Sequence, residues 1–447
     1  MRMKPLPSAR LAAFGAGLAV LLGSIGSTSA QFYTPIRFRN EGRGVLVTES
    51  LVVHPGVAIE GRYDSNVLQN ARDVRDAPYM RLIGHFDLAT RSPQRLTDGD
   101  GKVARQKVSF RLQSAFGFRE YLSNDEIITD QRALEIDAGL ELRLTPSRSF
   151  SFQILDSYLR SVSPRNGTTL GVGGAPAAAN FGTISRNANR LDLRAIVTPG
   201  GGRLSLTAAY ALWVDLYENT GLDVNNRLYN EAKLEAKYRL LPKTALQIEA
   251  IQRFYNYLET QAVAYGNVNS APLRLYAGLT GLVTPRLSTI LKVGYGHAMY
   301  KTGSSFNSVL AKAELAYRLL PMARLRAGYE RSFDDAPYGN YLSDHIVYAG
   351  YDHVVGRRVV LHADADFRSR RYAGFERFPV RPEATGATLM TLALGVDYQI
   401  QDWVYCGVGY DMHLQNIEQT VATNPGDFIG LVDFSRHQFY GRVGVSY

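Results

Sequence analysis

The segment LEIDAGLELRL, residues 134–144, shows the pattern that predicts the fold. Its even-numbered positions are leucine, isoleucine or alanine, and its odd-numbered positions are glutamate, aspartate, glycine or arginine. Because successive side chains of a strand point to opposite faces, one face suits lipid and the other suits water. Segments 108–119 and 309–318 alternate in the same way. Segments of about ten alternating residues predict a transmembrane β-barrel of the outer-membrane type.

The first thirty residues predict a secretory signal peptide. Three basic residues precede an apolar stretch at 11–22, and small residues at 28–30 suit signal peptidase. We therefore expect a signal peptide over residues 1–30 and a mature chain that begins near Gln31. The apolar stretch is shorter than the about 20 residues of a membrane-spanning helix, which argues against a helical inner-membrane protein.

Composition favours one large closed unit. The chain has 447 residues, 41 Gly, 27 Tyr and a mean hydropathy of −0.15, with no linker-like change after about Leu51. We expect a barrel over 51–447, preceded by a short periplasmic extension, helical or irregular, over 31–50. The chain has a single cysteine, Cys406, so no internal disulfide can form. Cys406 lies far from the position of a lipoprotein anchor. We expect its side chain on the lipid-facing side of a strand.

Turn chemistry predicts the topology. Compact Gly, Pro or polar connections occur at 146–148, 199–202, 242–243, 285–286, 321–322, 356–357 and 401–402, and longer polar stretches lie between them at 160–187, 256–272, 369–385 and 415–433. This alternation predicts an all-β, antiparallel up-and-down barrel of about 18 strands, with short periplasmic turns and long extracellular loops. Both termini would be periplasmic. The connection at 91–102 is long for a periplasmic turn, and a barrel of this size leaves room for an aqueous channel.

The C-terminal segment predicts an assembly partner. Phe439, Val443, Val445 and Tyr447 share one face and end on an aromatic residue. This ending resembles the signal that the barrel-assembly machinery recognises. We expect export to the outer membrane of a Gram-negative cell, in contact with its lipid and lipopolysaccharide.

The first predicted strand carries a family resemblance. Pro55-Gly56-Val57, followed by Tyr63-Asp64-Ser65-Asn66-Val67, resembles the start of the β-barrel porin 2 family. Members are single outer-membrane barrels that often accompany capsule or exopolysaccharide biosynthesis genes. The resemblance implies a component of polysaccharide secretion and supplies no catalytic motif.

The inward phase of the predicted strands supplies candidate pore-lining residues. The basic candidates are Arg62, Arg81, Arg111, Arg143, Arg194, Lys233, Lys237, Arg239, Lys292, Lys312, Arg318, Arg324 and Arg326. Acidic residues share this phase: Glu60, Asp87, Glu135, Asp137, Glu141, Asp192, Glu231, Glu235, Glu249, Glu314, Asp364 and Asp366. A cationic excess in a lumen favours anionic solutes or polymers. The alternative is a polar wall of cross-strand salt bridges.

Inward aromatic residues are candidates for stacking on sugars. They are Trp213, Tyr255, Tyr276, Tyr351, Tyr405 and Tyr440. The alternative is that these rings belong to an interfacial girdle or to packing.

Enzymatic and nucleic-acid functions are disfavoured. The scattered histidines show no catalytic or paired metal-ligand spacing, and we expect no cofactor and no metal. Asp334-Asp335 followed by Asp344-His345 suggests a solvated acidic loop, open to a divalent cation but without a dedicated metal site, rather than an aspartyl-type protease site. We expect Asp352-His353 to line the pore. Basic residues alternate with acids along the strands, which argues against nucleic-acid binding.

The leading functional hypothesis is an exit pore for a secreted, acidic polysaccharide that works with a periplasmic polysaccharide export protein. One alternative is a general or substrate-selective diffusion porin for small solutes. Another is a non-conducting barrel whose loops mediate surface adhesion. An N-terminal plug domain, as in vitamin or siderophore uptake, does not fit the about twenty residues before the first strand.

Overall fold

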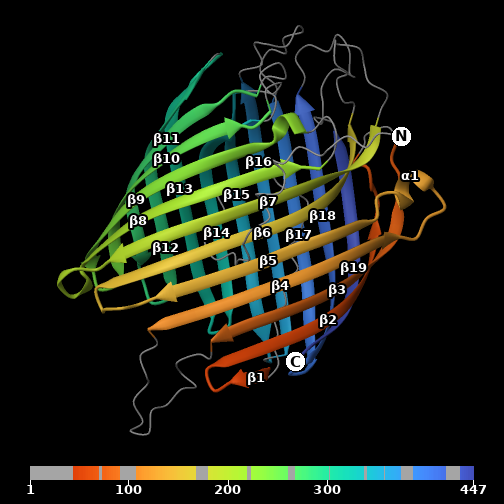
Figure 1. Cartoon of the computed structure of the whole chain (residues 1–447), viewed down its shortest axis with the longest axis horizontal. Coiled ribbons are helices and arrows are strands. Elements are labelled where there is room, and N and C mark those ends of the chain that lie inside the picture. The colour runs from red at the N-terminus through yellow and green to blue at the C-terminus, as the bar shows by residue number, and fades with distance from the viewer. Residues whose placement is uncertain are drawn as a thin grey trace, which may run out of the picture.

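The computed structural model describes residues 44–69, 73–90, 107–167, 180–218, 223–259, 267–301, 303–336, 340–356, 358–373, 386–418 and 433–447. The predicted signal peptide and residues 31–43 of the predicted extension lie outside these ranges. In the described part, eighteen long strands, β2 to β19, form one antiparallel sheet that closes on itself (Figure 1). The predicted fold class and strand number are confirmed.

The elements are named in chain order. The strands are β1 (Val45–Thr48), β2 (Leu51–Asp64), β3 (Ala77–Thr90), β4 (Val108–Tyr121), β5 (Ala133–Leu144), β6 (Phe150–Gly167), β7 (Asn180–Val197), β8 (Leu204–Tyr217), β9 (Arg227–Leu241), β10 (Thr244–Tyr257), β11 (Ser270–Leu282), β12 (Leu287–Tyr300), β13 (Phe306–Leu320), β14 (Ala323–Asp335), β15 (Tyr341–Val355), β16 (Val359–Ala373), β17 (Gly386–Gln401), β18 (Val404–Glu418) and β19 (Phe434–Ser446). Helix α1 (Glu126–Thr129) and the 3-10 turns η3 (Gly200–Gly202) and η4 (Asp223–Asn225) lie in connections.

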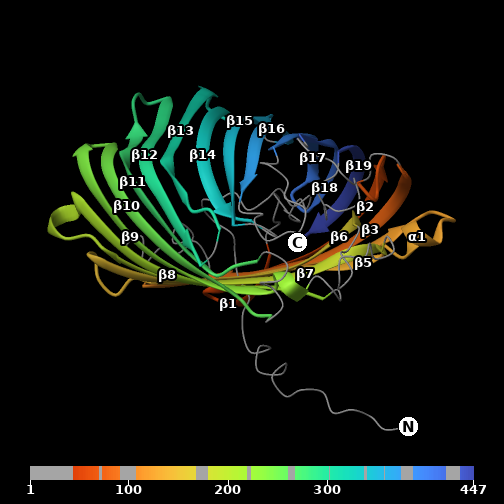
Figure 2. The same cartoon turned by 90° about the horizontal axis from the view of Figure 1, so that it is seen from above.

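The barrel closes where the last strand pairs with the first long one. β19 pairs with β2 from Gln438 opposite Asp64 to Ser446 opposite Gly56 (Figure 2). Beyond that point β1 takes over the free edge of β2, with Val45 opposite Val53. Pairing satisfies backbone groups that an open edge would leave exposed. The expectation of a helical or irregular extension is therefore wrong for residues 45–48.

Short turns and longer connections alternate between the two ends of the barrel. Turns such as 242–243 and 321–322 lie at one end, here called the short-turn end, and the chain terminus Tyr447 lies there too. Connections such as 122–132, which contains α1, lie at the other, the long-loop end. In outer-membrane barrels the short turns are periplasmic. The predicted loop at 160–187 is shorter than expected, because β6 extends to Gly167 and β7 begins at Asn180.

The two faces of the sheet differ as the alternation predicts. On β2, Val57 and Ile59 are more than half exposed on the outer face, whereas Glu60 and Arg62 are buried on the inner face. Exposed leucine, valine and phenylalanine side chains recur on the outer face of the other strands. A closed barrel satisfies its backbone internally and can present such a face to lipid. The chain is a transmembrane β-barrel of the outer-membrane type. Within the described residues, no helix is long and apolar enough to cross a membrane.

Two local features fix the sheet. At the seam between β19 and β2, Arg436 Nε lies 3.0 Å from both carboxylate oxygens of Asp64, and both residues are buried. On β11, a Cβ added at Gly278 would collide with the carbonyl oxygen of Leu291 on β12. Only a residue without a side chain allows the two backbones to approach this closely.

The inner wall as the candidate functional site

The strand register places all thirteen basic candidates, and most of the aromatic ones, in the inward phase. The inward basic residues are Arg62, Arg81, Arg111, Arg143, Arg194, Lys233, Lys237, Arg239, Lys292, Lys312, Arg318, Arg324 and Arg326, and the aromatic ones are Trp213, Tyr255 and Tyr276. Tyr405 and Tyr440 share this face, since Tyr440 lies beneath the Arg62 guanidinium and Tyr405 packs on Ala58 and Ile83. Whether these side chains line an open channel remains a prediction.

One strand has the phase opposite to the prediction. Tyr351 of β15 stands opposite Leu325, which is exposed on the outer face, so Tyr351 also faces outward. His353 follows the same phase, whereas Asp352 lies on the inner face opposite Arg324. The expectation that Tyr351 and His353 line the pore is wrong. Cys406 is confirmed on the outer face, opposite the exposed Tyr398.

Salt bridges neutralise much of the inner wall between β9 and β12. Lys233 Nζ lies 3.3 Å from carboxylate oxygens of both Glu235 and Glu249. Lys292 Nζ on β12 reaches Glu249 on β10 at 3.0 Å, across the intervening strand. Lys237 lies 2.6 Å from Glu235. These contacts favour the interpretation of a polar wall of cross-strand ion pairs.

A second ion-pair network is buried near the seam. Arg62 lies 2.6 Å from Glu60 and 3.0 Å from Asp411, and Arg81 is paired with Glu135. All five side chains are buried. Buried charges are tolerated only when they are paired and hydrogen-bonded. Arg62 and Arg81 therefore hold strands together and are not free to bind a solute.

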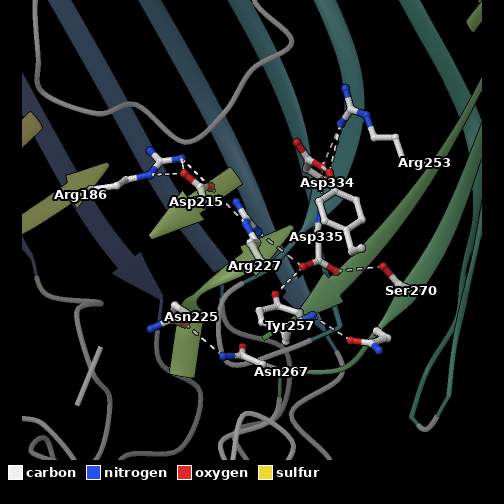
Figure 3. A network of polar contacts seen from close by, with 12 residues as sticks. Arg186, Asp215, Asn225, Arg227, Arg253, Tyr257, Asn267, Ser270, Asp334 and Asp335 are labelled. Atoms are coloured by element: carbon white, nitrogen blue, oxygen red, sulfur yellow. Dashed lines mark hydrogen bonds and ion pairs between the residues drawn. The ribbon is translucent and has the colours of Figure 1, made fainter. Parts of the chain in front are cut away.

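The tip of the β14–β15 hairpin folds against the inner wall. We call residues 332–336, 340 and 341 the tip; residues 337–339 lie outside the described part. Pairing of β14 with β13 ends at Arg331, which stands opposite Ala311. Beyond this point the β14 chain makes contact with β9, β10 and β11, which are not its neighbours in the sheet (Figure 3).

The two acids of the tip are held by side chains from three other strands. Asp334 Oδ1 accepts hydrogen bonds from Tyr255 at 2.7 Å and Arg253 at 3.3 Å. Asp335 accepts a hydrogen bond from Tyr257 Oη at 2.5 Å. Ser270 Oγ donates to Asp335 at 3.2 Å, and Arg227 lies 3.5 Å from the same carboxylate. Arg227 also pairs with Asp215, which binds Arg186 through both of its carboxylate oxygens.

Apolar side chains pack beneath these polar contacts. The ring of Phe333 stacks on Phe306 of β13 with a centroid separation of 4.0 Å. The guanidinium of Arg274 lies 4.6 Å from the centre of the Phe333 ring. Phe333 and Phe306 are buried together with Ala298 and Leu310. The tip therefore lies inside the barrel wall and covers part of β12 and β13.

These contacts correct the expectation of a solvated acidic loop. Asp335 is 6% exposed and Asp334 is paired with arginine and tyrosine, so neither carboxylate is free for a cation. Asp344 faces inward and binds Arg370 at 2.8 Å, whereas His345 faces outward beside Tyr329. Among the residues that the structure describes, no cluster of three or more His, Cys, Asp or Glu side chains could hold a metal ion.

An aromatic row runs across the inner wall. Trp213, Tyr229 and Tyr255 stand on the neighbouring strands β8, β9 and β10, with centroid separations of 4.8 Å and 4.6 Å. Tyr229 and Tyr255 are only 3% and 2% exposed, and Arg190 covers the face of Trp213 at 4.4 Å. These rings pack against one another, so the sugar-stacking role is not available to Tyr255 in this arrangement. The prediction missed Tyr229.

The outer face of β6 and β7 carries a polar cluster that the prediction also missed. Asp156 lies between Leu140 and Leu191 of the neighbouring strands, which share its outward phase. Asn189 Nδ2 donates to the Asp156 carboxylate at 2.9 Å. Nearer the long-loop end, Arg160 pairs with Glu218 at 2.8 Å. Polar groups on a lipid-facing surface are costly, so they bind one another.

Comparisons with known proteins give no family. No family model matches the chain, and no curated protein matches it. Among solved structures, the crystal structure of Acinetobacter baumannii OccAB4 is 11% identical with a TM-score of 0.44, covering 89% of this chain and 99% of that one. The siderophore receptor PirA from Acinetobacter baumannii is 9% identical with a TM-score of 0.43, and the match covers 90% of this chain and 81% of that one. The FrpB iron transporter from Neisseria meningitidis is 9% identical with a TM-score of 0.42, and the match covers 90% of this chain and 82% of that one. At these values the likeness carries no argument about function, and the strand pairing alone establishes the barrel.

Proposed function

We propose that this barrel is the outer-membrane exit for a secreted acidic polysaccharide. The observation that carries the proposal is the inner wall: side chains of both signs face inward on strands all around a barrel of a size that leaves an aqueous lumen. A wall of ion pairs stays hydrated without holding any one solute tightly. Such a wall suits passage of a long polar chain.

The polymer itself is inferred from the first strand. Pro55-Gly56-Val57 and Tyr63-Asp64-Ser65 resemble the β-barrel porin 2 family, which implies polysaccharide secretion. Asp64 is buried and binds Arg436 across the closing seam, so in this chain that part of the motif serves barrel closure. Delivery of the polymer to the short-turn end would need a periplasmic polysaccharide export protein.

The test is a clean deletion strain. Surface polysaccharide is measured by dye binding to intact cells, and total polymer is assayed in lysates. The proposal expects surface polymer to fall while polymer accumulates inside, and expects the plasmid-borne gene to restore it. An antibiotic-permeability assay controls for a general envelope defect. Normal surface polymer together with slower uptake of small solutes would contradict export and indicate a diffusion porin.

A further inference from the structure

Positive charges that pair with no described carboxylate gather at the short-turn end of the barrel. We call Arg203, Arg239, Lys243, Arg286, Arg318 and Arg324 the basic collar. All six side chains are exposed. They come from consecutive turns and strand ends between β8 and β14.

Backbone hydrogen bonds place collar residues on neighbouring segments of the rim. The amide of Arg239 donates to the carbonyl of Arg203 at 2.8 Å, and the amide of Arg318 donates to the carbonyl of Arg286 at 2.8 Å. Between them, the carbonyl of Lys243 accepts from Leu282 at 2.9 Å. Collar residues therefore recur along the rim on the strand ends and turns from β8 to β14.

The collar differs from the wall above it in its ion pairing. Within the described part of the chain, no ion pair joins any of the six side chains to a carboxylate. Segments 198–203, 239–244, 281–287 and 318–324 contain no aspartate or glutamate. Deeper in the barrel, by contrast, Lys233, Lys292 and Lys312 are all paired.

Two collar arginines stand at opposite positions of neighbouring strands, and their repulsion is unfavourable in the free protein. Arg318 of β13 stands directly opposite Arg324 of β14, and like charges at opposite positions repel. Asp352 of β15, opposite Arg324, is the acidic residue beside the collar in the register. One carboxylate cannot balance two guanidinium groups and the four further cations. A bound polyanion would relieve the repulsion.

We infer that the basic collar is the receiving site for a carboxylate-bearing polysaccharide at the short-turn mouth of the barrel. This inference rests on the proposed function. It adds that the polymer enters at the short-turn end and that it carries negative charge. Guanidinium groups bind carboxylates through paired hydrogen bonds, and several weak contacts on one chain add through multivalency.

The phase of the collar favours a threaded chain over a membrane lipid or a folded partner. Arg239, Arg318 and Arg324 lie in the inward phase and point toward the lumen, away from the lipid face. Above Arg239, Lys237 and Lys233 of the same strand are already paired with glutamate. A polyanion would therefore meet weaker sites in the lumen than at the mouth, so the lumen would not hold it tightly.

The test uses the purified full-length barrel in nanodiscs of uncharged lipid and a fluorescent oligogalacturonate probe. Anisotropy should report binding that salt weakens, and a neutral dextran of equal length should not bind. The variant R239Q/R318Q/R324Q should bind the probe about ten-fold or more weakly. The matched control R132Q/K301Q/R371Q, which removes three exposed cations at the long-loop end, should bind normally. Heat-modified gel mobility shows that both variants are folded.

Three results would overturn the inference: equal loss of binding in both variants, full binding by the collar variant, or no binding by the unmodified barrel. Tighter binding of polyglutamate than of oligogalacturonate would replace the polysaccharide with an acidic polypeptide. The outcome is separable from the export test. Collar binding with normal surface polymer in the deletion strain would keep the polyanion site and reject the export function.

Discussion

Asp335 at the end of β14 accepts a hydrogen bond of 2.5 Å from the hydroxyl group of Tyr257 on β10, although β11, β12 and β13 separate the two strands in the sheet. This contact shows that the β14–β15 tip crosses the inside of the wall. The tip therefore occupies part of the barrel interior at the long-loop end. The interior of the barrel is therefore shaped by a bent hairpin as well as by the strands.

Removing the tip acids should release the tip. In the variant D334A/D335A, the tyrosine and arginine partners on β9, β10 and β11 lose their acceptors, so we expect faster amide exchange at residues 332–336, 340 and 341. Hydrogen exchange in nanodiscs measures this effect. Asp402→Ala, in the exposed β17–β18 turn, is the control and should leave exchange at the tip unchanged. Unchanged protection in the double variant would show that the acids do not hold the tip.

The apolar contact beneath the tip should matter for stability. Phe333→Ala removes a buried ring that stacks on Phe306, and such cavities cost about 3–5 kcal/mol. Urea unfolding in lipid vesicles gives the free energy of unfolding. Phe333→Leu keeps most of the volume and should cost less than about 1.5 kcal/mol. A loss of equal size in both variants would argue against a cavity effect.

The buried ion pair at the seam should contribute more to the free energy of unfolding than an exposed pair of the same residue types. Asp64→Ala leaves Arg436 buried without its carboxylate, which typically costs about 3–5 kcal/mol. Asp364→Ala breaks its pair with the half-exposed Arg326 and should cost less than about 1 kcal/mol. The urea midpoints of the two variants test the difference. Closely similar midpoints would mean that the seam is held mainly by its backbone pairing.

Two glycines on the sheet should respond differently to the same change. Gly278→Ala should destabilise the barrel by about 1–3 kcal/mol, because the new methyl group meets the backbone of β12. Gly84→Ala meets nothing within 4 Å and should be neutral or slightly stabilising. Folding yield into vesicles and urea unfolding measure both. Equal behaviour of the two variants would contradict the close approach of β11 and β12.

The polar cluster on the outer face should behave as a coupled pair. Asn189→Ala removes a donor from the Asp156 carboxylate and should cost about 1–3 kcal/mol. The double variant D156A/N189A removes both partners and should regain much of that loss. Additive losses across this double-mutant cycle would show that the two residues are not coupled.

The sequence by itself determined the barrel. Alternation of period two, as in 134–144, assigns one face to lipid and one to the interior, and the Pro- and Gly-containing turns give the strand count. It failed on β15, where Tyr351 and His353 face outward. Both faces of that strand carry aromatic and polar residues, so alternation does not distinguish them.

Only the tertiary structure decided which charges are free. Asp334 and Asp335 are followed by residues typical of a loop, and their partners lie on β9, β10 and β11 because β14 bends inward past Arg331. Arg318 and Lys233 both lie in the inward phase that the sequence predicts. Lys233 forms ion pairs with Glu235 and Glu249, whereas Arg318 forms none with a described carboxylate. Whether two charged side chains form an ion pair depends on the distance between them when they stand on separate strands. The order of residues along one strand does not give that distance.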